Sequence, residues 1–258
     1  EPAMDTRVPV NERLRIAFRV PVDQVLVPYK AFITSPLMRP TFDQLIWNNR
    51  FTLAQEPMLA TEWSMSSDAK NWTFKLREGV PFHDAPGYEG GEFTANDVIK
   101  SYELMTAPGF RASNIPAWGE RLSSEDIEVV NDYEVVFNLS EAWPTLNFGA
   151  DEVHQNTMGI YSADYWDQSG QEVYEAHPVG TGPWKFVELK TNEYILWERF
   201  KEPGDDHWWQ IPEFRELQIL FVPEHATRLA MLAAGEVIPV NAGEGVLERD
   251  MPSVVINV

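Results

Sequence analysis

The chain contains no cysteine among its 258 residues. This absence excludes disulfide bonds, thiolate metal sites and a cysteine nucleophile, and it removes any lipid-bearing cysteine from the sequence given. No apolar run approaches the roughly 18 residues that a membrane-spanning helix needs. The first residues lack the charged and apolar regions of a signal peptide, so we expect any such peptide to be absent from this numbering.

Basic residues are scarce, with 20 Lys and Arg against 40 Asp and Glu, and the net charge is −20. Nucleic acids and anionic membrane surfaces are bound through clustered Lys and Arg, so neither is an expected partner. The acidic surplus is typical of a soluble exported protein. A mild attraction for cationic or amine-ended solutes is the other interpretation, although salt screens such fields beyond about 10 Å.

Catalytic motifs are also few. The chain has no H-E-x-x-H pair, no G-x-S-x-G elbow, no P-loop and no dinucleotide fingerprint after a strand. Its five histidines are scattered: His83, His154, His177, His207 and His225. We therefore expect no metal site, no cofactor and no enzymatic activity. The many carboxylates leave one alternative of another class, a carboxylate-using glycoside hydrolase.

The clearest local pattern runs through the strand and helix candidates of residues 72–105. Strict alternation over residues 72–77 predicts a strand with one apolar face. Thr94 is a candidate N-cap with Asp97 at the third helical position, which predicts a helix starting there. His83 and Asp84 lie in the loop between them, and we interpret the pair as fixing that loop by hydrogen bonds rather than as catalytic.

Other segments show weaker but readable patterns. Alternation and turn residues predict further strands and hairpins over residues 14–20, 126–139, 184–200 and 214–222. A helix is expected from Pro223 to its stop at Gly235, and a short helix over residues 41–48. A last strand is expected over residues 251–258. This mixture indicates an α/β or α+β fold.

Several separated segments together resemble one family, the family 5 extracellular solute-binding proteins of ABC transporters. They are T-F-D-Q-L and P-M-L-A-T-E-W early in the chain, T-F-K-L-R-E-G-V-P-F-H-D, F-T-A-N-D-V, P-V-G-T-G-P-W-K-F and R-L-A-M-L-A-A-G-E-V. Their order and spacing make the likeness specific. The chain departs from the pattern after Val237, where Ile238 replaces the usual acidic residue, which leaves the local hinge geometry open.

The resemblance implies lobes like those of type II, cluster C-like periplasmic binding proteins. It places residues 1–40 and 178–245 in a discontinuous lobe I, residues 41–177 in an inserted lobe II, and residues 246–258 at the start of a truncated lobe III. Family members are longer, so we expect either the amino-terminal portion of a larger protein or a shortened homologue. The glycines and proline of residues 180–183 suit a crossing between lobes.

The resemblance also implies the function. It predicts a monomeric, periplasmic or extracellular solute-binding component that captures peptides in a cleft and delivers them to a membrane ABC permease. An oligosaccharide is the alternative solute within the family, with the many tryptophans stacking on sugar rings, and the absence of a histidine cluster makes chelated nickel less favoured. A retained interaction module is a weaker third idea.

The lobe arrangement predicts which residues face the solute. They come from the loop after the first strand, from the start of the inserted lobe, from a polar loop late in that lobe and from the outgoing hinge. The candidates are Arg19, Val20, Asp23, Phe42, Asp43, His154, Gln155, Asn156, Asn241, Ala242, Gly243 and Glu244.

Overall fold

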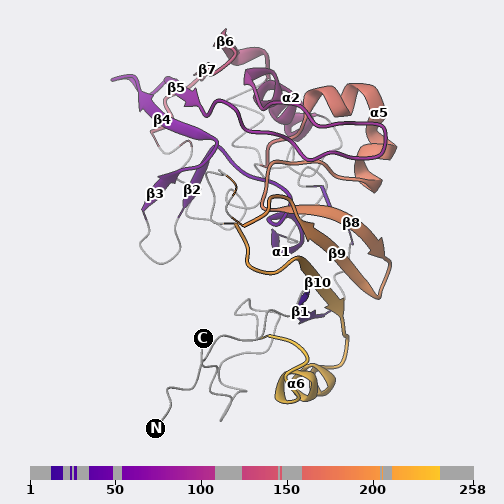
Figure 1. Cartoon of the computed structure of the whole chain (residues 1–258). Helices are drawn as coiled ribbons and strands as arrows, with labels where there is room; N and C mark the ends of the chain where they lie inside the picture. Colours follow the sequence, from indigo (N-terminus) through magenta and orange to yellow (C-terminus); the bar gives the residue numbers. More distant parts are fainter. Residues whose placement is uncertain are drawn as a thin grey trace. The chain divides into compact units, whose positions relative to one another are not determined.

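The computed structural model describes residues 13–19, 24, 26–27, 35–48, 54–107, 124–144, 146, 159–203, 205 and 211–238. The chain divides into two compact units (Figure 1). Unit 1 consists of Glu1–Gln24 and Pro183–Val258, and unit 2 consists of Val25–Gly182. Unit 1 is therefore discontinuous in sequence.

Unit 1 contains a four-stranded sheet in the order β1-β10-β9-β8. Its strands are β1 (Arg13–Phe18), β8 (Trp184–Lys190), β9 (Tyr194–Arg199) and β10 (Glu216–Phe221). The β8–β9 and β9–β10 pairs are antiparallel, while β1 pairs parallel to β10. The predicted first strand, the 184–200 hairpin and the 214–222 strand are confirmed, with ends that differ by at most two residues.

Side chains alternate between the two faces of the sheet of unit 1. Ile195 and Trp197 of β9 are buried, as are their β10 neighbours Leu217 and Ile219. The opposite face carries a charged row that runs in register across all four strands: Arg13, Glu216, Glu198 and Lys185. The row makes ion pairs at both ends, between Arg13 and Glu216 and between Lys185 and Glu198.

Helix α6 (His225–Ala233) packs against β1 through a small apolar cluster of Ala17, Leu232 and Val237. Gly235 ends the helix as predicted, with a positive φ of 70°. Its N–H donates to the Leu232 carbonyl at 3.0 Å, and the next N–H, of Glu236, donates to Met231 at 2.9 Å. These two bonds form a Schellman motif, which satisfies carbonyls at the helix end.

Unit 2 is built on an antiparallel sheet in the order β4-β5-β7-β6. Its strands are β4 (Ala60–Met65), β5 (Asn71–Leu76), β6 (Ile127–Asn131) and β7 (Glu134–Asn138). The alternation predicted for β5 is confirmed, since Trp72, Phe74 and Leu76 are all buried. The 126–139 hairpin is confirmed as β6 and β7, closed by a turn at 132–133.

Helices lie against this sheet and against each other. Helix α2 (Ala95–Thr106) packs on it through the Tyr102 ring, whose centroid lies 4.8 Å from that of Phe137. Helix α5 (Ala163–Ala176) contacts α2. Smaller elements complete the described part of the unit: α1 (Ser35–Met38), the 3₁₀ turn η2 (Ser124–Asp126), and the paired strands β2 (Ile46–Asn48) and β3 (Gln55–Pro57).

The short helix expected over residues 41–48 is wrong. That segment is non-helical: a turn at Thr41 is followed by irregular backbone until β2 begins at Ile46. The Gln44 and Leu45 carbonyls accept hydrogen bonds from the N–H groups of Leu59 and Ala60, at 3.0 and 2.8 Å. Pairing with a distant segment therefore replaces the local helical bonds. The strand expected over residues 251–258 lies outside the described residues.

Candidate functional site

A closely packed polar site in the described part of unit 2 joins three segments, residues 40–43, His83 and residues 180–182. We call it the exit junction because the chain leaves unit 2 directly after it. A Cβ atom on Gly180 would lie 2.1 Å from the Thr41 carbonyl oxygen, and one on Gly182 would lie 2.5 Å from the Pro40 carbonyl oxygen. Both positions therefore require glycine.

His83 holds the exit junction from the loop side. Its side chain is fully buried, and its backbone N–H donates to the Gly180 carbonyl at 2.9 Å. Its Nε2 lies 2.8 Å from the Gly182 carbonyl oxygen, which can only accept, so Nε2 carries a proton. Asp84 is exposed. The interpretation of His83 as a loop-fixing residue is confirmed.

Asp43 holds the exit junction from the opposite segment. The Thr181 hydroxyl donates to Asp43 Oδ2 at 2.9 Å, and both side chains are buried. The Asp43 carbonyl accepts the Ile160 N–H at 2.9 Å. A hydrogen bond to a buried carboxylate offsets part of its desolvation, so the Thr181 hydroxyl helps to stabilise Asp43 here. Thr181 was not among the residues predicted to matter.

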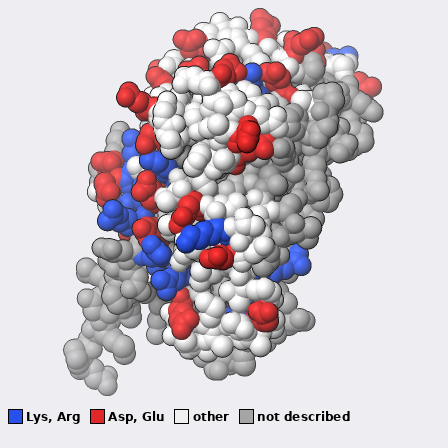
Figure 2. Space-filling view, turned by 90° about the vertical axis from the view of Figure 1, so that its right-hand side faces the viewer, with Lys and Arg blue, Asp and Glu red and all other residues white. Residues whose placement is uncertain are grey.

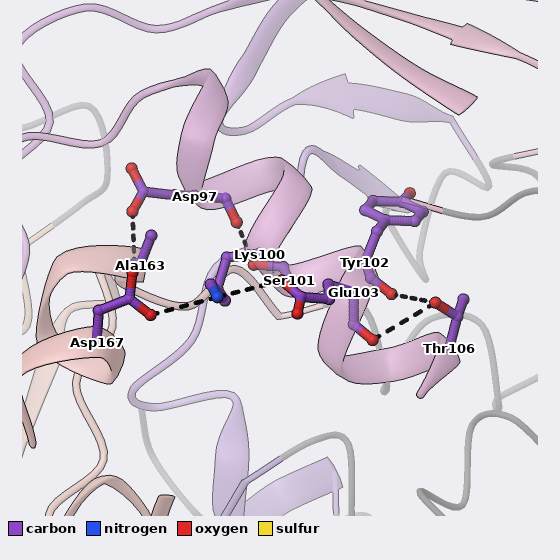
Figure 3. Close-up of polar contacts among 8 residues, drawn as sticks. All are labelled: Asp97, Lys100, Ser101, Tyr102, Glu103, Thr106, Ala163 and Asp167. Atoms are coloured by element: carbon purple, nitrogen blue, oxygen red, sulfur yellow. Dashed lines mark hydrogen bonds and ion pairs between the residues drawn. The ribbon is translucent and has the colours of Figure 1, made fainter. Parts of the chain in front are cut away.

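A second polar cluster lies between α2 and α5 (Figure 3). The Asp97 side chain accepts the N–H groups of Thr94 at 2.7 Å and of Ala163 at 2.8 Å. The predicted helix start is confirmed, because Asp97 and Thr94 form the capping box expected from the sequence. Burial raises the pKa of Asp97 to about 6, against the opposing effect of these hydrogen bonds.

The residues predicted to face a solute are only partly described. Arg19 is exposed just after β1. Phe42 and Asp43 are buried within unit 2, where the Phe42 ring packs at a centroid distance of 5.1 Å on Tyr161. The other predicted residues lie outside the described part of the chain: Val20, Asp23, His154, Gln155, Asn156, Asn241, Ala242, Gly243 and Glu244. Burial gives Phe42 and Asp43 a packing role, and solute contact stays a prediction for the whole set.

Three further observations concern the charged and apolar side chains of the described residues. Within the described ranges, no three His, Asp or Glu side chains are grouped so that they could hold a metal ion. None of the described helices combines the length and apolar character of a membrane span. Acidic side chains are spread over the described surface in Figure 2, with Lys and Arg side chains lying beside many of them.

Comparison with known proteins shows which family the chain matches. Residues 54–250 match the model described as "Bacterial extracellular solute-binding proteins, family 5 Middle". "Heme-binding protein A" of Haemophilus influenzae is 32% identical over 198 residues, which cover 70% of this chain and 34% of that protein. The "Dipeptide-binding protein" of Escherichia coli is 27% identical over 210 residues, covering 76% of this chain and 38% of that protein.

A solved structure shares the fold. The periplasmic binding protein DppA from Helicobacter pylori, in complex with the peptide STSA, superimposes with a TM-score of 0.74 at 27% identity. The match covers 88% of this chain and 46% of that chain. The chain thus spans about a third of the length of the curated relatives it matches and less than half of this solved one.

Proposed function

Because the chain belongs to the family 5 bacterial extracellular solute-binding proteins, we propose that it forms part of the receptor of an ABC importer that captures peptides. The observation that supports this most directly is the family match over residues 54–250, together with the fold shared with a peptide-bound relative. The relatives are binding proteins, and the glycoside hydrolase alternative is not favoured. We infer a periplasmic or extracellular location from the same relatives.

The proposed mechanism is capture without chemistry. A solute held between lobes is buried and screened from water, and closure is driven only by its higher affinity for the closed form. A peptide backbone can be bound through main-chain hydrogen bonds, while pockets accept its side chains. The permease would then distinguish the closed receptor from the open one.

The test is to identify what the protein binds. The protein from its natural reading frame is purified under native conditions, and the bound molecules are identified by mass spectrometry after denaturation. We expect a mixture of short peptides, and calorimetric titration of the stripped protein with synthetic di- to pentapeptides should then show binding. Recovery of heme, nickel or an oligosaccharide with no affinity for peptides would reject the peptide proposal but keep the receptor class. Turnover of an aryl glycoside would reject both.

Among the predicted binding residues, Arg19 offers the cleanest test. It is exposed directly after β1, so a guanidinium at this position can bind the carboxylate end of a peptide. Arg19→Ala should weaken peptide affinity about tenfold or more, whereas Arg15→Ala on the same strand should leave it unchanged. Equal affinities for both variants would remove Arg19 from the proposed site and leave residues 241–244 to be tested in the same way.

A further inference from the structure

The chain returns from unit 2 to unit 1 between Gly182 and Pro183. Both polar groups of the Gly182 backbone are bonded within unit 2. The N–H donates to the Thr41 carbonyl at 2.9 Å, and the carbonyl accepts His83 Nε2 at 2.8 Å. The Gly182 Cα also lies so close to Pro40 that a side chain would not fit. The last residue of unit 2 is therefore held on both sides of its Cα.

The hydrogen bond from His83 fixes more than Gly182 itself. The Gly182 carbonyl belongs to the peptide group that joins Gly182 to Pro183, and such a group is planar. A bond that orients this carbonyl therefore also orients the nitrogen and Cα of Pro183 with respect to unit 2. His83 is a firm anchor, because its ring is fully buried and its own N–H donates to the Gly180 carbonyl at 2.9 Å.

Pro183 restricts the next torsion of the crossing. Its ring holds φ at about −65°. Its carbonyl accepts the Phe200 N–H at 3.1 Å, and Phe200 directly follows β9 of unit 1. The Pro183 nitrogen and Cα are thus held by unit 2, whereas its carbonyl is held by unit 1. Between these two anchors, the soft backbone torsion is ψ of Pro183, the rotation about its Cα–C bond.

The incoming crossing, between Gln24 and Val25, is also short. The Gln24 side chain exchanges two hydrogen bonds with Asn192 in the β8–β9 turn. Its Nε2 donates to Asn192 Oδ1 at 2.6 Å, and its Oε1 accepts the Asn192 N–H at 2.8 Å. Leu26 and Val27, directly after the crossing, are buried. Because the units are joined at both places, any movement between them must also be allowed by the outgoing crossing.

We propose that His83 and Pro183 make the outgoing crossing a pivot with one soft torsion, so that the two units turn at this crossing about the Cα–C bond of Pro183. His83 is the positioning residue of the pivot, because its imidazole fixes the peptide group between Gly182 and Pro183. Without this bond, ψ of Gly182 becomes a second soft torsion, since glycine has no Cβ to restrict it. The rotation then no longer has a single axis.

One consequence for binding rests on the proposed function. In a receptor that closes on its solute, a single axis makes closure the same movement for every solute. Additional torsional freedom in the open form has to be lost on closure, which lowers the apparent affinity. His83 would therefore contribute to affinity without touching the solute, and its loss should weaken the binding of all peptides by a similar factor.

The pivot is tested by measuring distances between the two units. Because the chain has no cysteine, Glu128→Cys on β6 and Glu193→Cys in the β8–β9 turn provide two exposed label sites, one in each unit. Double electron–electron resonance on the full 258-residue chain then gives the distribution of distances between two nitroxide labels. We expect this distribution to broaden in His83→Leu, which frees ψ of Gly182, and in Pro183→Ala, which frees φ of residue 183. No solute is present, so the result is independent of whether the protein binds peptides.

Two control variants separate the torsion from general loosening. His83→Gln keeps a side-chain N–H donor and should restore a distribution close to that of the parent chain. Thr181→Val removes a neighbouring hydrogen bond of the exit junction without freeing either torsion, and it should not broaden the distribution. Equal broadening in all four variants, or none in Pro183→Ala, would overturn the pivot. If His83→Leu does not fold, a broad distribution for Pro183→Ala with a narrow one for His83→Gln supports the pivot, and any other combination overturns it.

Discussion

The charged row of unit 1 and the polar groups that hold unit 2 together differ in exposure. In unit 1 the charged row across the sheet pairs on the surface, where Lys185 and Glu198 keep 22% and 45% of their side-chain area exposed. In unit 2 the polar groups that hold segments together are buried: Asp43, His83, Asp97, Ser101, Ser162 and Thr181. Surface pairs contribute little to stability, whereas a buried group left without its partner costs its full desolvation penalty.

Unit 1 has buried polar residues of its own, and they support the same rule. Gln218 and Arg228 are each 6% exposed. The Arg228 guanidinium donates to the carbonyls of Val222 and Pro223, at 2.6 and 2.9 Å, where β10 ends and α6 begins. In both units, the buried polar side chains fix the path of the backbone through hydrogen bonds. The exposed ones mainly interact with solvent.

The largest effect should come from a methyl group at the exit junction. Gly180→Ala places a Cβ atom 2.1 Å from the Thr41 carbonyl oxygen, so the backbone must move. We expect a loss of at least about 3 kcal/mol in the free energy of unfolding, measured with denaturant. Gly79→Ala is the control, since its site is open and only its φ of 70° is unfavourable, at about 1 kcal/mol. Similar losses for both would mean that the close approach is unimportant.

Replacement of His83 should have the next largest effect. His83→Leu introduces an apolar side chain of similar bulk and leaves the buried Gly182 carbonyl without the Nε2 donor at 2.8 Å. The expected loss is about 2–4 kcal/mol. Hydrogen exchange measured by mass spectrometry should show faster exchange at residues 178–182. Glu89→Gln, at an exposed position nearby in the chain, should change neither quantity. A stable His83→Leu protein with unchanged exchange would contradict the role proposed for His83 in the exit junction.

Thr181 tests a single hydroxyl in the same place. Thr181→Val keeps the shape but removes the donor to Asp43 Oδ2 at 2.9 Å. We expect a loss of about 1–3 kcal/mol, because the buried carboxylate loses the hydrogen bond from Thr181. Thr181→Ser restores the hydroxyl and should recover most of this loss in the same denaturant experiment. If Ser and Val behave alike, methyl packing rather than the hydrogen bond determines the effect.

The smallest effect should come from the charged row of unit 1. Lys185→Met removes the ammonium that lies 3.3 Å from Glu198 Oε1 while keeping most of the apolar stem. The expected loss is under about 1 kcal/mol, and it should shrink further in high salt because exposed charges are screened. A loss as large as that of Thr181→Val would mean that the exposed ion pair of unit 1 stabilises the fold as much as the buried hydrogen bond of unit 2.

The sequence predicted the elements that are specified locally. The strand alternation of residues 72–77 and the cap at Thr94 depend on neighbours in the chain, and both are present. Helix α5 was not predicted, because Gly170 interrupts its helical pattern with non-helical angles (φ 75°, ψ 169°). Ser162, which accepts the N–H of Tyr165, was the one available signal of its start.

The exit junction was predictable only in part. A histidine in a loop suggested a structural hydrogen bond at His83. Its partner, the Gly182 carbonyl, lies 99 residues away in the chain. Thr181 and Asp43 are separated by 138 residues, and nothing near either indicates the other. Long-range pairs of this kind follow from the folded topology, which single-sequence patterns do not contain.

The parallel pairing of β1 with β10 has a consequence for how the chain is made. Arg13 and Glu216 are 203 residues apart, so the ribosome must synthesise the whole stretch between them before β1 can pair with β10. All residues of unit 2 have been translated by then, because that unit is continuous. During translation, unit 2 can therefore acquire its native structure before β1 has paired with β10.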